Sequence, residues 1–308
     1  MLKTITLELK HPLDRTIDGS ELTIDRLVHL SERELFHFEL PTMTGSLKLG
    51  DLFSIHFSDG SKKDSNGIEQ QLIMSGDLRK IVGLSSHTRL GRTVIEGDVG
   101  DRFGSSQMGG ELLALGSVGH NAFADKRGGM AFVSGNAGDG LGAPSPASTR
   151  GIQGGDTIVL GNVGARACER MRRGTVLVNG NTGSYLAHGW IAGTILVIGS
   201  LGSHWCSGMK RGSLILTSMP SSPSGATWTQ ARPTELTFLP ILWKHLQKEL
   251  HLIQGIVESK PQLRPLLSEL RHQLPRGRWV DRCRGDLECD GRGELLVTSG
   301  DEALEVNP

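Results

Sequence analysis

Few residues of this chain have the types and spacing that catalysis or metal binding requires. The glycines of segment 138–142 are similar to part of a dinucleotide-binding loop, but no strand–helix–strand unit follows them. Three histidines in the middle of the chain, His120, His188 and His204, follow no spacing typical of zinc ligands. No Ser/His/Asp arrangement is evident. The sequence therefore predicts no catalytic, cofactor-binding or metal-binding residue.

The four cysteines support the same interpretation. They are Cys168, Cys206, Cys283 and Cys289, and no two of them form a CxxC pair, so neither a zinc site nor a disulfide framework is indicated. Cys168 and Cys206 belong to a column of mostly small residues and are expected to be small buried side chains. A reduced, cytoplasmic setting is expected.

Basic pairs that precede glycines are the most prominent polar pattern. The pairs are Lys126-Arg127, Arg172-Arg173 and Lys210-Arg211. If the units that carry them stack, their side chains line one edge, where they are candidates for docking an acidic surface on a partner. The alternative is a solvated edge that lysine and arginine protect from the addition of another strand.

Glycines indicate the element that must position these side chains. Gly-x-x-Gly tetrapeptides begin at Gly97, Gly116, Gly135, Gly161, Gly180 and Gly199, and end at Gly100, Gly119, Gly138, Gly164, Gly183 and Gly202. Their starts are 19, 19, 26, 19 and 19 residues apart, so one seven-residue insertion lies between Gly138 and Gly155. A second series keeps the same step: Gly91, Gly110, Gly129, Gly155, Gly174, Gly193 and Gly212. A constant period of about 20 residues is typical of a solenoid.

Short apolar runs between the glycines predict strands. They are rich in β-branched residues, as at Thr157–Leu160 and Thr194–Ile198, and nothing between them has the length of a helix. Strands that return at a constant step without crossover helices predict an all-β solenoid, a parallel β-helix of about seven turns. We expect residues 1–70 to form a small N-terminal α/β cap, residues 71–218 the β-helix, and residues 219–308 a linker and a C-terminal helical cap.

Apolar residues at helical spacing predict two helices in the C-terminal segment. The first series is Leu239, Leu242, Trp243, Leu246, Leu250 and Ile253, and the second is Leu263, Leu266, Leu267, Leu270 and Leu274. A pair of partner-binding helices is the alternative to a cap. The proline-containing insertion, residues 139–155, is expected to project as a loop and to be either a contact point or a simple decoration.

Composition excludes several classes of partner. The 308 residues include 33 basic and 33 acidic side chains, which argues against bulk attraction to nucleic acid or to an anionic membrane. No run of 18 apolar residues and no signal-peptide core is present, so neither a membrane span nor export is expected.

The repeat resembles a known family. The unit at Gly161–Val178, with Gly-Asn-x-Gly followed by Met-Arg-Arg-Gly and a β run, is similar to the GXGXG repeat. That repeat is shared by the C-type subunit of formylmethanofuran dehydrogenase and the C-terminal domain of the glutamate synthase large subunit. An enlarged turn over residues 135–155, the segment Leu49–Phe53 and the tail Arg284–Leu295 favour the family of the C-type subunit. The likeness covers roughly residues 45–298. Three positions depart from the usual Met of the repeat: Gln107, Lys126 and Trp190.

The resemblance implies a right-handed parallel β-helix that acts as a non-catalytic structural subunit in a complex of one-carbon metabolism. The expected complex is the formyltransferase/hydrolase of methylotrophs, which converts formyl-tetrahydromethanopterin to formate through formyl-methanofuran. Three partner subunits are implied: one amidohydrolase-like, one dehydrogenase-like and one formyltransferase. A methanofuran-type cofactor, and zinc in the amidohydrolase-like partner, belong to the complex rather than to this chain.

Other functions remain open at this stage. The CO2-reducing tungsten or molybdenum formylmethanofuran dehydrogenase uses the same kind of structural subunit. A structural domain of the glutamate synthase type would need flavin and amidotransferase modules, and no such segment is recognisable. A β-helical acyltransferase would show a six-residue period and a catalytic histidine, whereas the step here is 19 residues.

Overall fold

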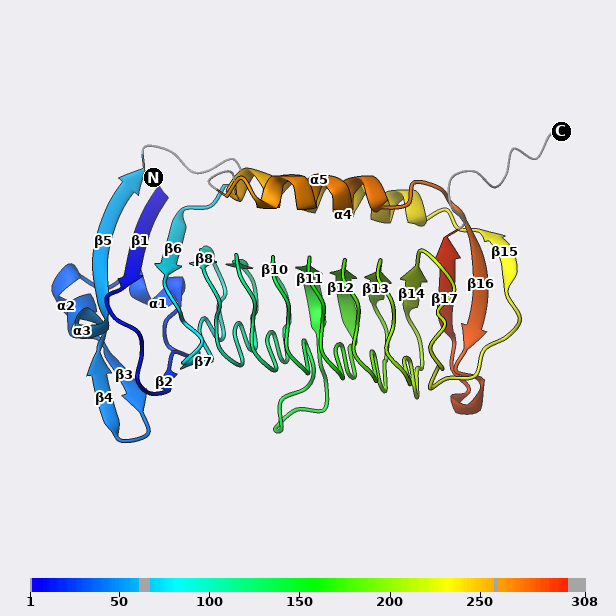
Figure 1. The fold of residues 1–308 in the computed structure, drawn as a ribbon, viewed down its shortest axis with the longest axis horizontal. Helices are drawn as coiled ribbons and strands as arrows, with labels where there is room; N and C mark the ends of the chain where they lie inside the picture. Colours follow the sequence, from blue (N-terminus) through cyan, green and yellow to red (C-terminus); the bar gives the residue numbers. More distant parts are fainter. Residues whose placement is uncertain (1, 61–66, 258–259, 299–308) are drawn as a thin grey trace.

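The computed structural model describes residues 2–60, 67–257 and 260–298, which form an elongated body built on one large sheet (Figure 1). The repeats supply its central strands, which are β6 (Gln70–Ser75), β8 (Arg92–Glu96), β9 (Glu111–Ala114), β10 (Met130–Val133), β11 (Gln153–Val159), β12 (Arg173–Val178), β13 (Thr194–Val197) and β14 (Ser213–Leu216). Neighbours pair in parallel and in register, so Leu113, Phe132 and Ile158 lie side by side across three strands. The seven-residue insertion between β10 and β11 therefore leaves this register unchanged.

The Gly-x-x-Gly corners hold successive repeats together. The third residues of the first five tetrapeptides form parallel bridges from one repeat to the next, as Val118 does with Ala137. The second residue accepts a hydrogen bond from the next repeat: Oδ1 of Asn162 lies 2.7 Å from the backbone nitrogen of Asn181. The same bond recurs at the other corners, with the acceptors Asp98, Ser117, Asn136 and Asn181. Each corner thus satisfies a backbone donor of its neighbour.

The sheet continues beyond the repeats at both ends. At the N-terminal end β6 pairs in parallel with β1 (Leu2–Leu9), and β1 pairs antiparallel with β5 (Phe53–Gly60). At the C-terminal end β14 pairs in parallel with β17 (Gly293–Thr298), which is followed by the antiparallel strands β16 (Trp279–Gly285) and β15 (Arg232–Glu235). A short 3-10 helix, Leu287–Cys289, joins β16 to β17. The result is one mixed sheet of 13 strands.

This mixed sheet corrects the predicted fold class. The expectation of an all-β solenoid, a parallel β-helix of about seven turns closed by an N-terminal α/β cap and a C-terminal helical cap, is wrong. The glycine period reports only the step between neighbouring central strands. It carries no information about the antiparallel strands that extend the sheet, or about the elements that cover its faces. The two long helices lie along the sheet rather than across its end (Figure 1).

Those helices cover one face of the sheet. Helix α4 (Leu239–Ile256) and helix α5 (Leu263–Gln273) turn their apolar sides towards alternate residues of the strands. Trp243, Leu246 and Leu250 belong to the same buried cluster as Phe132 and Leu177. Residues at the intervening strand positions, such as Val133 and Val178, belong to a second cluster on the opposite face. This alternation follows from the two-residue period of a strand.

A smaller unit lies at the N-terminal end of the repeats (Figure 1). Strands β4 (Gly45–Lys48), β3 (Glu39–Thr42), β2 (Ile17–Asp18) and β7 (Ile81–Val82) form a four-stranded sheet. Three short helices accompany it, α1 (Ile24–Leu27), α2 (Glu32–Phe36) and α3 (Leu49–Leu52). Helix α2 begins with a capping box in which Ser31 and Glu34 each accept a backbone hydrogen bond from the other's position. Over the described ranges, no helix is both long and apolar enough to cross a membrane.

Candidate docking surface

The repeat glycines are required by the close approach of neighbouring repeats. At Gly180, an added Cβ atom would lie 2.6 Å from the carbonyl carbon of Gly161 and 2.6 Å from Oδ1 of Asn162. At Gly116 it would lie 2.5 Å from the carbonyl oxygen of Gly97. The obstacle is mainly backbone of the preceding repeat, which cannot rotate away. The glycines of the Gly-x-x-Gly corners therefore set the shape of the scaffold.

The second glycine series has a different cause. All seven of its members have positive φ, from +65° at Gly110 to +119° at Gly193. This left-handed conformation lets the chain turn into each strand, and it disfavours side chains that carry a Cβ atom. The basic residues immediately precede these turns, so the turns determine where the basic side chains lie.

Hydrogen bonds across the turns define the register of the basic residues. The backbone nitrogen of Arg127 donates to the carbonyl oxygen of Gln107, and that of Lys210 donates to Trp190, both at 2.7 Å. Arg127, Arg172 and Lys210 consequently occupy one outer column, and Arg173 and Arg211 occupy the next position. All five side chains are exposed. Across residues 2–60, 67–257 and 260–298, none of these five forms an ion pair with a described carboxylate.

Lys126 differs from the other five predicted docking residues because it points inward. It is 0% exposed and shares its column with Gln107, Met171, Trp190 and Met209. Its Nζ atom donates to the carbonyl oxygens of Gly129 at 2.6 Å and Asp156 at 3.0 Å. Burial lowers the pKa of Lys126 to about 7. Lys126 is therefore unavailable to a partner, because the pair Lys126-Arg127 stands one position out of register with the other two pairs.

The insertion forms a loop whose base is held together by hydrogen bonds. The backbone nitrogen of Ile152 donates to the carbonyl oxygen of Gly142 at 3.0 Å, and Ser145 donates to Oδ1 of Asp125 at 3.1 Å. The loop and the β3–β4 hairpin project from the same side of the molecule (Figure 1). Between them lies a groove of ≈ 1110 Å³ lined from one side by Thr42 and Met43 and from the other by Pro144, among others. Met43 at the hairpin tip is 97% exposed.

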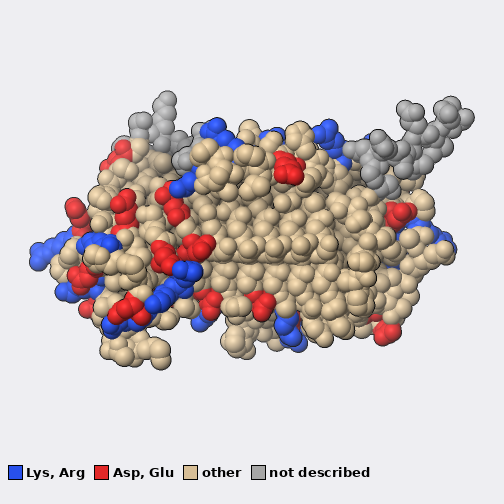
Figure 2. Space-filling model, in the orientation of Figure 1, with Lys and Arg blue, Asp and Glu red and all other residues tan. Residues whose placement is uncertain are grey.

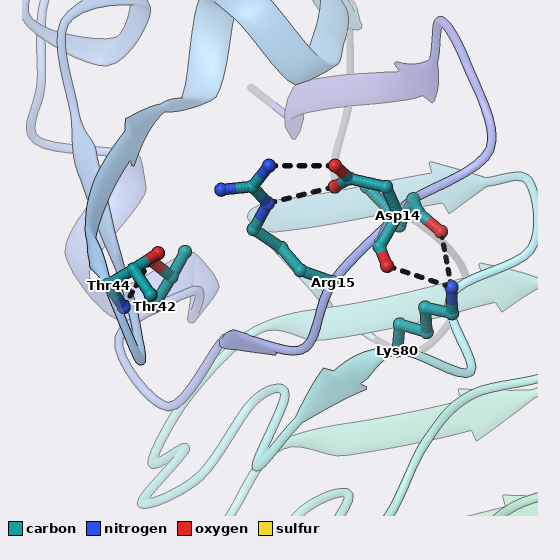
Figure 3. Close-up of polar contacts among 6 residues, drawn as sticks. Asp14, Arg15, Thr42, Thr44 and Lys80 are labelled. Atoms are coloured by element: carbon teal, nitrogen blue, oxygen red, sulfur yellow. Dashed lines mark hydrogen bonds and ion pairs between the residues drawn. The ribbon is translucent and has the colours of Figure 1, made fainter.

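Polar contacts hold the segment that immediately precedes Thr16 and Ile17, two residues that line this groove. Nζ of Lys80 donates to the carbonyl oxygens of Leu13 and Asp14, and Arg15 forms a two-bond ion pair with Asp14 (Figure 3). Figure 2 shows charged side chains gathered over the N-terminal elements and a broad uncharged surface over the repeats. The molecule therefore offers a partner two different features, an exposed basic column and a groove between the loop and the hairpin.

The histidines and cysteines of the repeats do not assemble a reactive centre with one another. Nδ1 of His120 accepts a hydrogen bond from the backbone nitrogen of Asp139, and the ring of His204 stacks on Tyr185 with a centroid distance of 4.9 Å. Burial raises the pKa of the Cys168 thiol to about 12 and also raises the pKa of Cys206. Both thiols are therefore protonated and unreactive near neutral pH.

The comparisons with known proteins give one informative result. No family model and no curated protein matches the chain. Among solved structures, the chain is similar to a chain in the crystal structure of the formyltransferase/hydrolase complex (FhcABCD) from Methylorubrum extorquens in complex with methylofuran. The two chains are 31% identical with a TM-score of 0.77, and the match covers 96% of this chain and 99% of the other. The chain therefore belongs to the family of that component of the formyltransferase/hydrolase complex.

Proposed function

We propose that this chain is the C-type subunit of a cytoplasmic formyltransferase/hydrolase complex and serves as a non-catalytic scaffold. The observation that carries the proposal is the match over nearly the full length of both chains. The complex would convert formyl-tetrahydromethanopterin to formate through a formylated methanofuran-type cofactor. Its other subunits would be an amidohydrolase-like protein with zinc, a dehydrogenase-like protein and a formyltransferase.

The repeat glycines support the scaffold role. Their spacing is explained by backbone contacts between repeats, so no chemical function is needed to account for them. The long sheet presents an extended surface on which several subunits can bind side by side.

The exposed basic column supports a specific docking mode. Arg127, Arg172 and Lys210 form no ion pair with a described carboxylate, whereas Arg92 pairs with Glu111 within the chain. We propose that these residues, with Arg173 and Arg211, contact an acidic surface on one of the partner subunits. Complementary charge at an interface favours specific association.

Charge reversal tests this docking mode. Arg172→Glu in the co-expressed complex should weaken assembly by about tenfold, equivalent to about 1.4 kcal/mol. Adding Arg127→Glu should weaken it further. The matched control is Arg33→Glu, an exposed arginine on α2 at the far end of the molecule (Figure 1). The readouts are the yield of co-purified subunits and the rate of formate release per assembled complex.

The two readouts separate docking from catalysis. A scaffold predicts a lower yield of complex with unchanged turnover in the complexes that do assemble. Normal yield with reduced turnover would contradict the proposal, and so would formate release by the isolated chain. Equal effects of Arg172→Glu and Arg33→Glu would refute the basic column as the docking site while leaving the scaffold role intact.

A further inference from the structure

Three side chains that can offer metal ligands meet where α4 lies against the sheet. Asp156 lies on β11, while His245 and Glu249 lie one turn apart on α4. One ligand atom from each residue lies within 4.8 Å of the ligand atoms of the other two. Over the described ranges, no other set of three or more His, Cys, Asp and Glu side chains meets this condition.

Helix geometry and burial place the three groups at an accessible rim. Residues four apart on a helix share one side, so His245 and Glu249 lie beside the buried Leu246 and Leu250 and face the same strand. Nε2 of His245 is 3.1 Å from Oδ2 of Asp156, and its Nδ1 is 4.0 Å from Oε1 of Glu249. The side chain of Glu249 is 17% exposed and that of His245 is 41% exposed. Solvent can therefore reach one side of the cluster while its other side is protected.

Two other carboxylates in the same row of the sheet provide a comparison. This row runs across the sheet from residue 111 on β9 through residues 130 and 156 on β10 and β11. Further along the sheet it includes residues 213 and 294 on β14 and β17. Glu111 pairs with Arg92 at 2.6 Å, and Glu294 pairs with Arg282. Asp156 faces a second carboxylate and an imidazole instead of a guanidinium.

This arrangement leaves negative charge that a cation would neutralise. The carboxyl groups of Asp156 and Glu249 lie together in a half-buried place, and one ring nitrogen of His245 is within hydrogen-bond distance of Asp156. Nζ of Lys126 donates to the backbone carbonyl oxygen of Asp156 and interacts with its carboxylate only through space. A divalent ion would remove the repulsion between the two carboxylates.

We propose that Asp156, His245 and Glu249 bind one zinc-type divalent transition metal ion that fixes α4 to the sheet. One imidazole nitrogen with two carboxylate oxygens favours zinc over magnesium or calcium, which prefer oxygen ligands alone. Water would complete the coordination on the exposed side. The ion would join positions 156 and 245, which are 89 residues apart in the chain.

Metal binding to the purified full-length chain tests the proposal directly. After removal of metal with a chelator, zinc is titrated in competition with a chromophoric chelator, and cobalt(II) is used as a spectroscopic probe of its coordination. We expect one zinc ion per chain. Asp156→Asn and His245→Ala should each lower the zinc affinity by at least about tenfold. The matched control is His251→Ala, an exposed histidine on the same helix outside the cluster, which should retain the affinity.

Thermal unfolding supplies the second readout. Zinc should raise the unfolding midpoint of the wild type and of His251→Ala but not that of His245→Ala, because the ion binds only the folded state. If Asp156→Asn does not fold, the variant Glu249→Gln, which changes a proposed ligand on α4, is measured in its place. Absence of zinc uptake, or equal uptake by His245→Ala and His251→Ala, would overturn the proposal. A pH-dependent stability without zinc uptake would also overturn it, because His245 would then bridge the carboxylates as an imidazolium.

Discussion

Replacement of Gly180 by alanine isolates the contact that defines the repeat. The added Cβ atom would lie 2.6 Å from the carbonyl carbon of Gly161, whereas carbon atoms in contact normally stay about 3.5–4.0 Å apart. An overlap of about 1 Å with fixed backbone belongs at the upper end of the cost of overpacking, about 3 kcal/mol. For a chain of this size, we expect the unfolding midpoint to fall by about 6 °C.

The chain provides a control with the same chemical change and the opposite expected sign. Gly255 lies in α4, and outside the backbone of that helix no atom of the described residues lies within 4 Å of a Cβ added there. Gly255→Ala should therefore stabilise the helix by about 0.5–1 kcal/mol. Both variants are compared with the wild type by calorimetry or by circular dichroism on heating. If Gly180→Ala left the midpoint unchanged, or if the two variants shifted it equally, close stacking would not be the reason for glycine at this corner.

Three further outcomes are expected. Asn162→Ala should lower the free energy of unfolding in urea by about 1 kcal/mol, because the backbone N–H of Asn181 loses its acceptor. Asn162→Ser should lower it by less, because Ser117 accepts the equivalent bond at another corner. Equal losses of stability in the two variants would contradict this explanation. Lys126 has a pKa of about 7 in the folded chain and an ordinary value of 10.5. Between pH 7 and pH 10.5 the unfolded chain therefore binds more protons than the folded chain. The free energy of unfolding should rise with pH across this window, by up to about 5 kcal/mol. Lys126→Met should lack that rise, and parallel pH profiles for the two proteins would refute the assignment. Gly180→Val should lower the yield of assembled complex without altering the turnover of the complexes that form, and a normal yield would count against the scaffold role.

The local elements of the repeats could be predicted because their signals are local. Glycine spacing and β-branched runs indicated the central strands, and the apolar spacing after residue 238 indicated α4 and α5. The sheet as a whole could not be predicted. Strand β17 pairs with β14 about 80 residues earlier in the chain, and no short-range pattern encodes that pairing.

The basic pairs show how residues that look equivalent in the sequence can occupy different positions in the repeat. Lys126-Arg127 resembles the other basic pairs in its residue types, but two glycines follow it instead of one, so it lies one residue earlier in the repeat. The departure of Lys126 from the usual Met was the available signal, since Met171 and Met209 occupy the same buried column. The cluster of Asp156 with His245 could not be found from spacing, because it depends on how α4 lies on the sheet.

The pairing of β14 with β17 has a practical consequence for work with this protein. A fragment that ended after the last repeat would lose both the strand that completes its edge and the helices that shield its apolar face. Such a fragment would present an open hydrogen-bonding edge to other copies of itself and would polymerise. Expression plasmids should therefore encode the chain at least through Thr298. An affinity tag is better inserted in the exposed loop around Thr149 than attached to a chain shortened at its C-terminal segment.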